Sequence, residues 1–127
     1  MSIPESVRTG MQQTNALFSS AVVKNGDIDA LDNIYTIDAR ILPPGANLIQ
    51  GRAQIKAFWQ QAIAGLGLKD AKLSSVDAQA AGDSVLEVGK ADLTLGEGQI
   101  LTVKYVVHWK QEAGLWKWDT DIWNMNQ

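Results

Sequence analysis

Three runs of alternating apolar and polar residues limit the folds open to this chain more than any other feature. They cover residues 84–95, 99–110 and 115–123, and short glycine-containing turns separate them. Alternation with a period of two is typical of β-strands that bury one face, and turns this short join strands that run antiparallel. The pattern predicts a meander of long antiparallel strands, preceded by another strand within residues 69–80.

The alternation also divides the side chains of each run between two faces. One face of the first run carries Val85, Glu87, Gly89, Ala91, Leu93 and Leu95. One face of the second run carries Leu101, Val103, Tyr105, Val107 and Trp109. Its other face carries Thr102, Lys104, Val106, His108 and Lys110. One face of the third run carries Trp116, Trp118, Thr120 and Ile122. Its other face carries Leu115, Lys117, Asp119, Asp121 and Trp123.

The first half of the chain has a helical period instead. Apolar residues recur every three or four positions within residues 4–24, 27–35 and 52–64, which predicts three helices. Between the last two we expect a turn at Asp38, a short strand over residues 39–42 and a loop over residues 43–51. Helices gathered on one side of a curved, mainly antiparallel sheet make an α+β fold, here a single domain over residues 1–127. Such a sheet wrapped over helices forms a cone, whose open end is the expected ligand site.

Composition excludes several classes of function. The 127 residues include 11 basic and 14 acidic side chains, and the net charge of −3 argues against nucleic acid or an anionic membrane as the main partner. With no cysteine, the chain has no disulfide framework, thiolate zinc site or cysteine nucleophile. We see neither a basic, apolar leader nor a membrane-spanning run, so we expect a cytoplasmic protein that makes no membrane contact.

Several short pieces of sequence occur in a distinctive order. They are Asn25-Gly26-Asp27, residues 34–39 (IYTIDA) running into Leu42-Pro43-Pro44-Gly45, Gly51 followed by Ile55 and Phe58-Trp59, Gly114-Leu115-Trp116-Lys117, and Asp121-Ile122-Trp123-Asn124. In this order they resemble the NTF2-like superfamily, most closely its SnoaL-like, DUF4440 and ketosteroid isomerase-like branches. The resemblance implies a cone-shaped α+β barrel with three N-terminal helices and a homodimer formed through the outer sheet face. It implies no particular reaction, because this fold serves many functions.

The chain departs from the ketosteroid isomerase pattern at the positions that carry its chemistry. The place of the carboxylate base is taken by Pro43, and that of the phenol by about Ser19, with Phe18 beside it. The protonated carboxylic acid falls near Val106. Because this proton-transfer machinery is missing, we expect that the chain is not a ketosteroid isomerase.

Asp119 and Asp121 are the strongest candidates for chemistry from the pattern itself. On one strand face they would lie about 6.5–7 Å apart. In an apolar pocket walled by tryptophan, a carboxylate has a raised pKa and can act as a general acid or base, so Asp121 is the catalytic candidate. The alternative is that both are solvated charges, with Lys117 as their partner.

Other residues are candidates for the wall of the pocket. Glu87 lies among small and apolar residues, where a carboxylate must be paired or face a wet cavity. Tyr35 and Trp59 each carry a polar group that needs a partner when buried, although simple core packing would also explain them. His108 is either a base near neutral pH or a hydrogen-bonded residue at a dimer interface.

Tryptophan is unusually frequent and unevenly placed. Four of the five tryptophans fall in the last 19 residues, and each aromatic side chain buries about 150–250 Å². One face of a small cone does not bury that much surface, which favours a homodimer. Trp123 shares its predicted face with Asp119 and Asp121, so we place it at the pocket.

The sequence leaves two functions open. The first is a pocket for a hydrophobic, cyclic small molecule, in a protein that works as an isomerase or cyclase without a cofactor or metal. The second is a non-catalytic homodimerising module that binds a ligand or a protein. A cavity holding a carboxylate with a raised pKa would support the first, and a cone filled by side chains would support the second.

Overall fold

The computed structural model describes residues 3–126. The helical elements are α1 (Glu5–Leu17), a π-helical continuation η1 (Phe18–Lys24), a 3₁₀ helix η2 (Ile28–Asn33) and α2 (Arg52–Leu66). The strands are β1 (Tyr35–Leu42), β2 (Ile49–Gln50), β3 (Asp70–Ala81), β4 (Ser84–Thr94), β5 (Ile100–Glu112) and β6 (Leu115–Met125). No helix within residues 3–126 is long and apolar enough to cross a bilayer.

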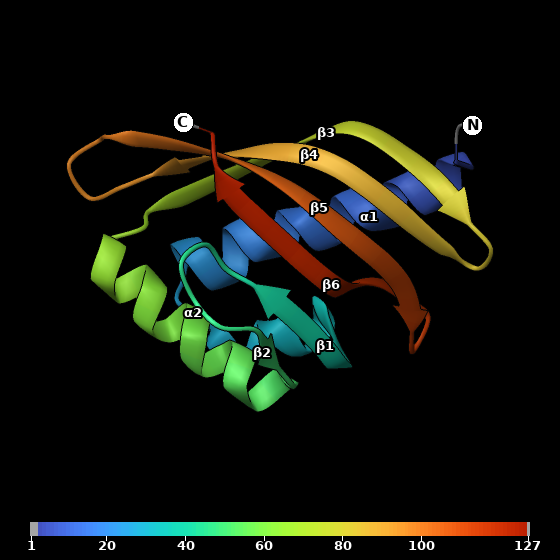
Figure 1. Ribbon diagram of the computed structural model, residues 1–127, viewed down its shortest axis with the longest axis horizontal. Helices are drawn as coiled ribbons and strands as arrows, with labels where there is room; N and C mark the ends of the chain where they lie inside the picture. Colours follow the sequence, from blue (N-terminus) through green and yellow to red (C-terminus); the bar gives the residue numbers. More distant parts are fainter. Residues whose placement is uncertain (1–2, 127) are drawn as a thin grey trace.

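The six strands form one curved sheet in the order β2-β1-β6-β5-β4-β3. β1 runs parallel to β6, and all other neighbours are antiparallel. Figure 1 shows β3–β6 arching over α1, with α2 lying beside β1 and β2. The sheet stays open between its edge strands β2 and β3, so the predicted α+β cone is confirmed as an open, mixed sheet with helices on its concave face.

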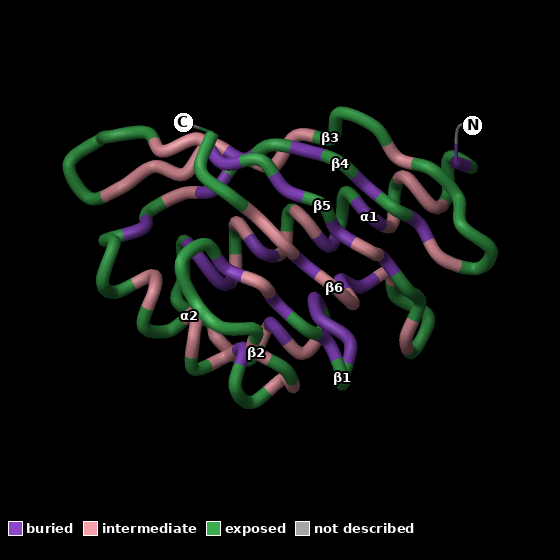
Figure 2. Tube along the Cα trace, viewed as in Figure 1, coloured by how far each residue is buried: buried purple, intermediate pink, exposed green. Residues whose placement is uncertain are grey.

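The predicted meander is confirmed, together with the faces of β4 and β5. Buried and exposed residues alternate along both strands, as Figure 2 shows. Val85, Glu87 and Ala91 on β4, and Tyr105 and Trp109 on β5, all turn inward and are at most 6% exposed. The apolar rows that the sequence assigned to one face therefore form the core side of the sheet.

The second predicted helix is shorter than expected. It is a 3₁₀ helix that ends at Asn33, and Tyr35 starts β1 instead of closing the helix. Asp38 is also part of β1, so the predicted turn is wrong. Pairing with β6 explains both differences. The backbone N–H of Trp118 in β6 donates to the Ile34 carbonyl at 2.7 Å, and the residues after Ile34 pair in parallel with β6 as strand β1.

A β-bulge in β6 changes the predicted faces of the last strand. Trp118 lies opposite Trp109, whereas Asp121 lies opposite Val107. Three residues along β6 therefore span the same length of the sheet as two residues along β5. The extra residue turns both Trp118 and Asp121 inward. The prediction that Asp119 and Asp121 share a face is therefore wrong.

Candidate functional site

The concave side of the sheet holds a small cavity of about 50 Å³. Its walls come from η1, α2 and strands β3–β6, which bring distant parts of the chain together. Almost all of the lining is aromatic or aliphatic, with one carboxylate: Phe18, Trp59, Leu73, Ala91, Leu93, Val103, Tyr105, Val107, Trp118, Asp121 and Trp123. The cavity is therefore an apolar space that could hold a compact group next to a single carboxylate.

Asp121 is fixed by a chain of hydrogen bonds from two other elements. The Tyr35 hydroxyl, at the start of β1, donates to Asp121 Oδ2 at 2.7 Å. Trp59 Nε1, on α2, donates to the same Tyr35 oxygen at 3.2 Å. Among residues 3–126, no side chain donates a hydrogen bond to Asp121 Oδ1. Among the described side chains, Tyr35 thus holds one carboxylate oxygen in place, and the other has no side-chain donor.

Burial sets the protonation behaviour of Asp121. Desolvation is the main cause that raises its pKa, from 3.8 to about 7, and the nearby charge of Glu87 acts in the same direction. The hydrogen bond from Tyr35 opposes the shift, because it stabilises the ionised form. Burial and the Asp121 charge raise the pKa of the Tyr35 hydroxyl well above its ordinary value. Near neutral pH, Asp121 can therefore give or take a proton while Tyr35 keeps its own.

Glu87 is a second buried acid, close to the cavity but not part of its wall. It is 1% exposed, and its Oε1 accepts a hydrogen bond from Trp109 Nε1 at 3.0 Å. Burial raises its pKa against that hydrogen bond. Glu87 instead lines an open groove of about 670 Å³ between α1 and β3. Glu87 was predicted in the wall of the pocket, and the structure corrects this, because the cavity beside Asp121 is lined without it.

Tyr105 is a cavity residue that the sequence analysis missed. Its hydroxyl is buried and lacks a hydrogen-bond partner of good geometry within residues 3–126. Its ring covers Gly89 on the neighbouring strand, where a Cβ atom would collide with the phenol and lie 2.8 Å from the Ser74 carbonyl oxygen. The signal was the direct pairing of a glycine with a tyrosine on the inward face.

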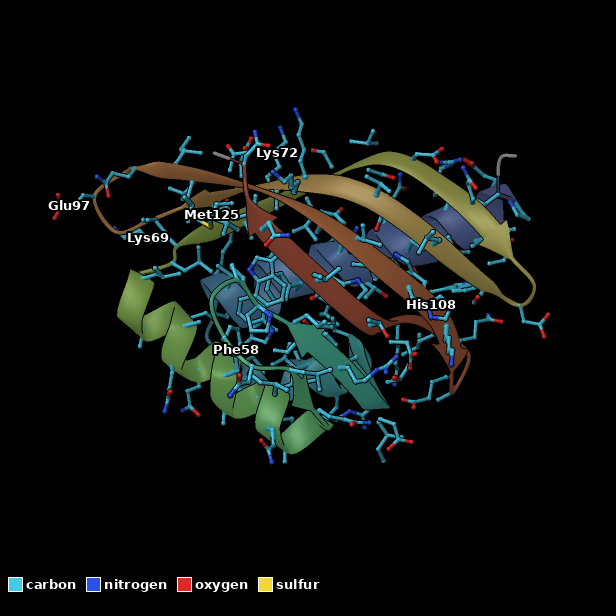
Figure 3. The ribbon with its side chains drawn as sticks, in the orientation of Figure 1. Phe58, Lys69, Lys72, Glu97, His108 and Met125 are labelled. Atoms are coloured by element: carbon cyan, nitrogen blue, oxygen red, sulfur yellow. The ribbon has the colours of Figure 1, made fainter. Side chains whose placement is uncertain are left out.

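The mouth of the cavity is formed by stacked aromatic rings. Trp59 and Trp123 stack with centroids 5.3 Å apart and planes 18° apart. Phe58 packs edge-on against both, and Figure 3 shows it between α2 and β6. Trp59 and Trp123, both predicted to lie at the pocket, line this cavity, and Phe58 packs beside them against the core.

The structure separates His108 and Asp119 from the cavity. His108 Nε2 lies 2.8 Å from Ser84 Oγ on the outer face of the sheet, far from Phe58 in Figure 3. Asp119, at the bulge, accepts a hydrogen bond from Thr36 Oγ1 at 2.8 Å and lies 3.5 Å from Lys110 Nζ. The candidate site is corrected to exclude both residues, because alternation alone does not reveal the bulge that turns Asp119 outward.

The site offers no obvious place for a metal. Within residues 3–126, no group of three or more histidine, aspartate or glutamate side chains is arranged to hold an ion. The group here that can exchange a proton near neutral pH is the Asp121 carboxyl.

Comparison with solved structures supports the fold. A domain of unknown function with a cystatin-like fold from Nostoc punctiforme superposes with a TM-score of 0.82 at 11% identity, covering 98% of this chain and 80% of the other. An NTF2-like protein of unknown function from Pseudomonas putida gives a TM-score of 0.75 at 18% identity, covering 97% and 89%. The crystal structure of LinA gives 0.73 at 15% identity, covering 96% and 87%. At such identities the likeness establishes the fold alone.

Sequence comparison identifies the family. No curated protein matches the chain. Residues 16–118 match the family described as the SnoaL-like domain, a segment that reaches from the end of α1 to the middle of β6 and includes Tyr35, Trp59 and Trp118. With the fold and the family match in agreement, the chain belongs to the SnoaL-like domain family and has an NTF2-like fold.

Proposed function

We propose that this protein binds a small apolar molecule in the aromatic cavity and moves a proton to or from it with Asp121. The reaction class is that of isomerases and cyclases that need no cofactor. One observation carries the proposal: a buried carboxylate whose pKa is raised to about 7, held by Tyr35 within an almost wholly apolar wall.

The geometry suits this role because the two oxygens of Asp121 differ. Tyr35 binds Oδ2, and Trp59 orients Tyr35 in turn, so the carboxylate has a fixed direction. A general acid or base works best when its pKa is close to the operating pH. Asp121 meets this condition, and the exclusion of water strengthens its interaction with a bound ligand.

The volume of the cavity limits what enters it. Its volume of about 50 Å³ is far below the roughly 300–1,000 Å³ of typical ligand pockets. A compact part of a ligand fits beside Asp121, and a larger ring requires Trp59 and Trp123 to move at the mouth. We expect the reacting part of the molecule to be small even if the whole ligand is cyclic.

Filling the cavity tests the proposal. Ala91 lines the cavity and is 5% exposed, so Ala91→Leu should abolish binding without unfolding the protein. Ala64→Leu, on the exposed surface of α2, is the matched control. A panel of small cyclic ketones and alcohols should shift the indole N–H signals of Trp59 and Trp118 in NMR spectra of the native protein and Ala64→Leu only. Equal shifts in Ala91→Leu would place binding elsewhere and defeat the proposal.

A second candidate function, assembly into a homodimer, is supported by the outer sheet face. Leu86, Val88 and Val106 lie there on adjacent strands and are 46%, 42% and 36% exposed. We propose that a second copy covers this patch, which is compatible with a ligand on the opposite face. Size exclusion with light scattering should give a dimer for the native chain and a monomer for Val106→Lys. A native monomer at micromolar concentration would contradict it.

A further inference from the structure

The aromatic rings of the cavity surround Asp121 from several elements. Phe18 comes from η1, Trp59 from α2, Tyr105 from β5, and Trp118 and Trp123 from β6. The ring centroids of Phe18 lie 5.1 Å from Trp59 and 5.2 Å from Trp118. Five aromatic side chains thus wall a space that is only a few atoms wide. The faces of such rings carry partial negative charge.

The charged side chains around this cavity are acidic. Among residues 3–126, the residues lining the cavity include no lysine, arginine or histidine. Two acids lie in this interior, Asp121 in the wall and Glu87 close enough for its charge to act on Asp121. Two largely buried basic side chains, Arg52 and Lys117, are paired with another acid, since Arg52 Nη2 and Lys117 Nζ each lie 2.8 Å from Glu112 Oε1. The cavity is therefore complementary to a positive charge.

We propose that the ligand carries a compact methylated ammonium group, which binds in this cavity with its N–H directed at Asp121 Oδ1 and its methyl groups against the aromatic rings. The inference rests on the proposed function, because it uses the same cavity and narrows the class of its ligand. It explains why a carboxylate is buried here without a basic partner. A buried charge is costly unless it is paired, and the ligand supplies the pair.

Attraction between a cation and aromatic rings adds to the ion pair. Each cation–π contact contributes about 0.5–2 kcal/mol, and the effect is largest in desolvated sites. A neutral molecule of the same size gains the apolar contacts but neither the ion pair nor the cation–π term. The cavity should therefore select the charged form of an amine over a neutral group of equal size.

Dimethylammonium and ethanol make a matched pair of probes, because each has three non-hydrogen atoms and only the first is charged. Titration at pH 8, with sodium chloride holding ionic strength constant, should shift the indole N–H signals of Trp59 and Trp118. We expect dimethylammonium to bind at least tenfold more tightly than ethanol. Asp121→Asn should remove that preference. Asp119→Asn, which makes the same charge change on the outer face, should retain it.

A second measurement uses the native protein alone. The titratable groups around Asp121 are Tyr35 on β1, Glu87 on β4 and Tyr105 on β5, and Trp59 faces it from α2. Because the cation binds the ionised carboxylate, its affinity should fall up to about tenfold for each pH unit below the Asp121 pKa. Dimethylammonium keeps its charge over this pH range, so the change in affinity reports a change in the protonation of the protein.

The outcomes separate the two proposals. Equal affinity for the two probes, or a preference that survives in Asp121→Asn, would overturn the ammonium ligand while leaving the apolar pocket in place. No shift with either probe would also overturn it. The proposed function is then judged by the ketone and alcohol panel with Ala91→Leu.

Discussion

Replacing Asp121 with asparagine is expected to make the protein more stable than the native form at pH 8, with a much smaller gain at pH 5. The folded pKa of Asp121 is raised from 3.8 to about 7, so the native state holds this proton more tightly than the unfolded chain. Stability from the protonated group is present at low pH and is lost as pH rises from about 4 to about 7. Each unit of pKa difference is worth about 1.4 kcal/mol.

The expected change in the free energy of unfolding follows from the interval between the two pKa values. Between pH 5 and pH 8 the native protein should lose about 3 kcal/mol relative to Asp121→Asn. Asparagine still offers an oxygen to the Tyr35 hydroxyl, so the hydrogen bond is kept. Urea unfolding of both proteins at pH 5, 6, 7 and 8 measures the difference. Asp119→Asn serves as the control, and a difference between native and Asp121→Asn that does not change with pH would contradict the burial argument.

Trp118→Ala is expected to destabilise the protein by about 3–5 kcal/mol, the usual cost of removing a large aromatic side chain from a core. Trp118 is 3% exposed and packs against Phe18, Tyr35 and Trp109 at centroid distances of 5.2, 5.1 and 6.1 Å. Its Nε1 also donates to Asn15 Oδ1 at 3.2 Å. The substitution opens a cavity at the centre of the molecule and leaves the Asn15 oxygen without this donor.

Trp123→Ala on the same strand provides the comparison. Trp123 is half-buried at the mouth, so its removal should cost less than that of Trp118 while enlarging the opening of the cavity. Urea midpoints of the two variants at one pH decide between them. Equal losses of stability would show that the bulge does not place Trp118 in the core as described.

Most of the fold follows from local patterns in the sequence. The period of two assigns the faces of β4 and β5 because these two strands pair with each other in unbroken register. The last strand fails this test, since the bulge near Asp119 shifts the inward face by one residue. Tyr35 was assigned to a helix because its contact with β6 is non-local and leaves no trace in helical spacing.

The candidate site was predicted in part. Trp59, Asp121 and Trp123 line one cavity and Tyr35 donates a hydrogen bond to Asp121, and their polar groups or aromatic faces suggested a pocket. Trp118 and Tyr105 were not among the predicted site residues, because alternation shows which side a residue faces but not how near it lies to an acid. His108, a candidate for the pocket wall in the sequence, lies instead on the outer face of the sheet beside Ser84.

The account depends on the state of one carboxylate. If Asp121 is buried beside Tyr35 and near Glu87, it is neutral for much of the time at neutral pH, and it is available both as an acid and as the partner of a cation. If it is solvated, neither the proton transfer nor the ammonium site has a physical basis. The pH dependence of stability tests this indirectly, through the unfolding equilibrium.

Carbon-13 NMR of the aspartate carboxyl groups tests it directly. With Asp121→Asn used to assign the signal, titration of the native protein should show the Asp121 carboxyl changing with a midpoint near pH 7. A midpoint near pH 4, the ordinary value for aspartate, would contradict the buried acid and the function built on it.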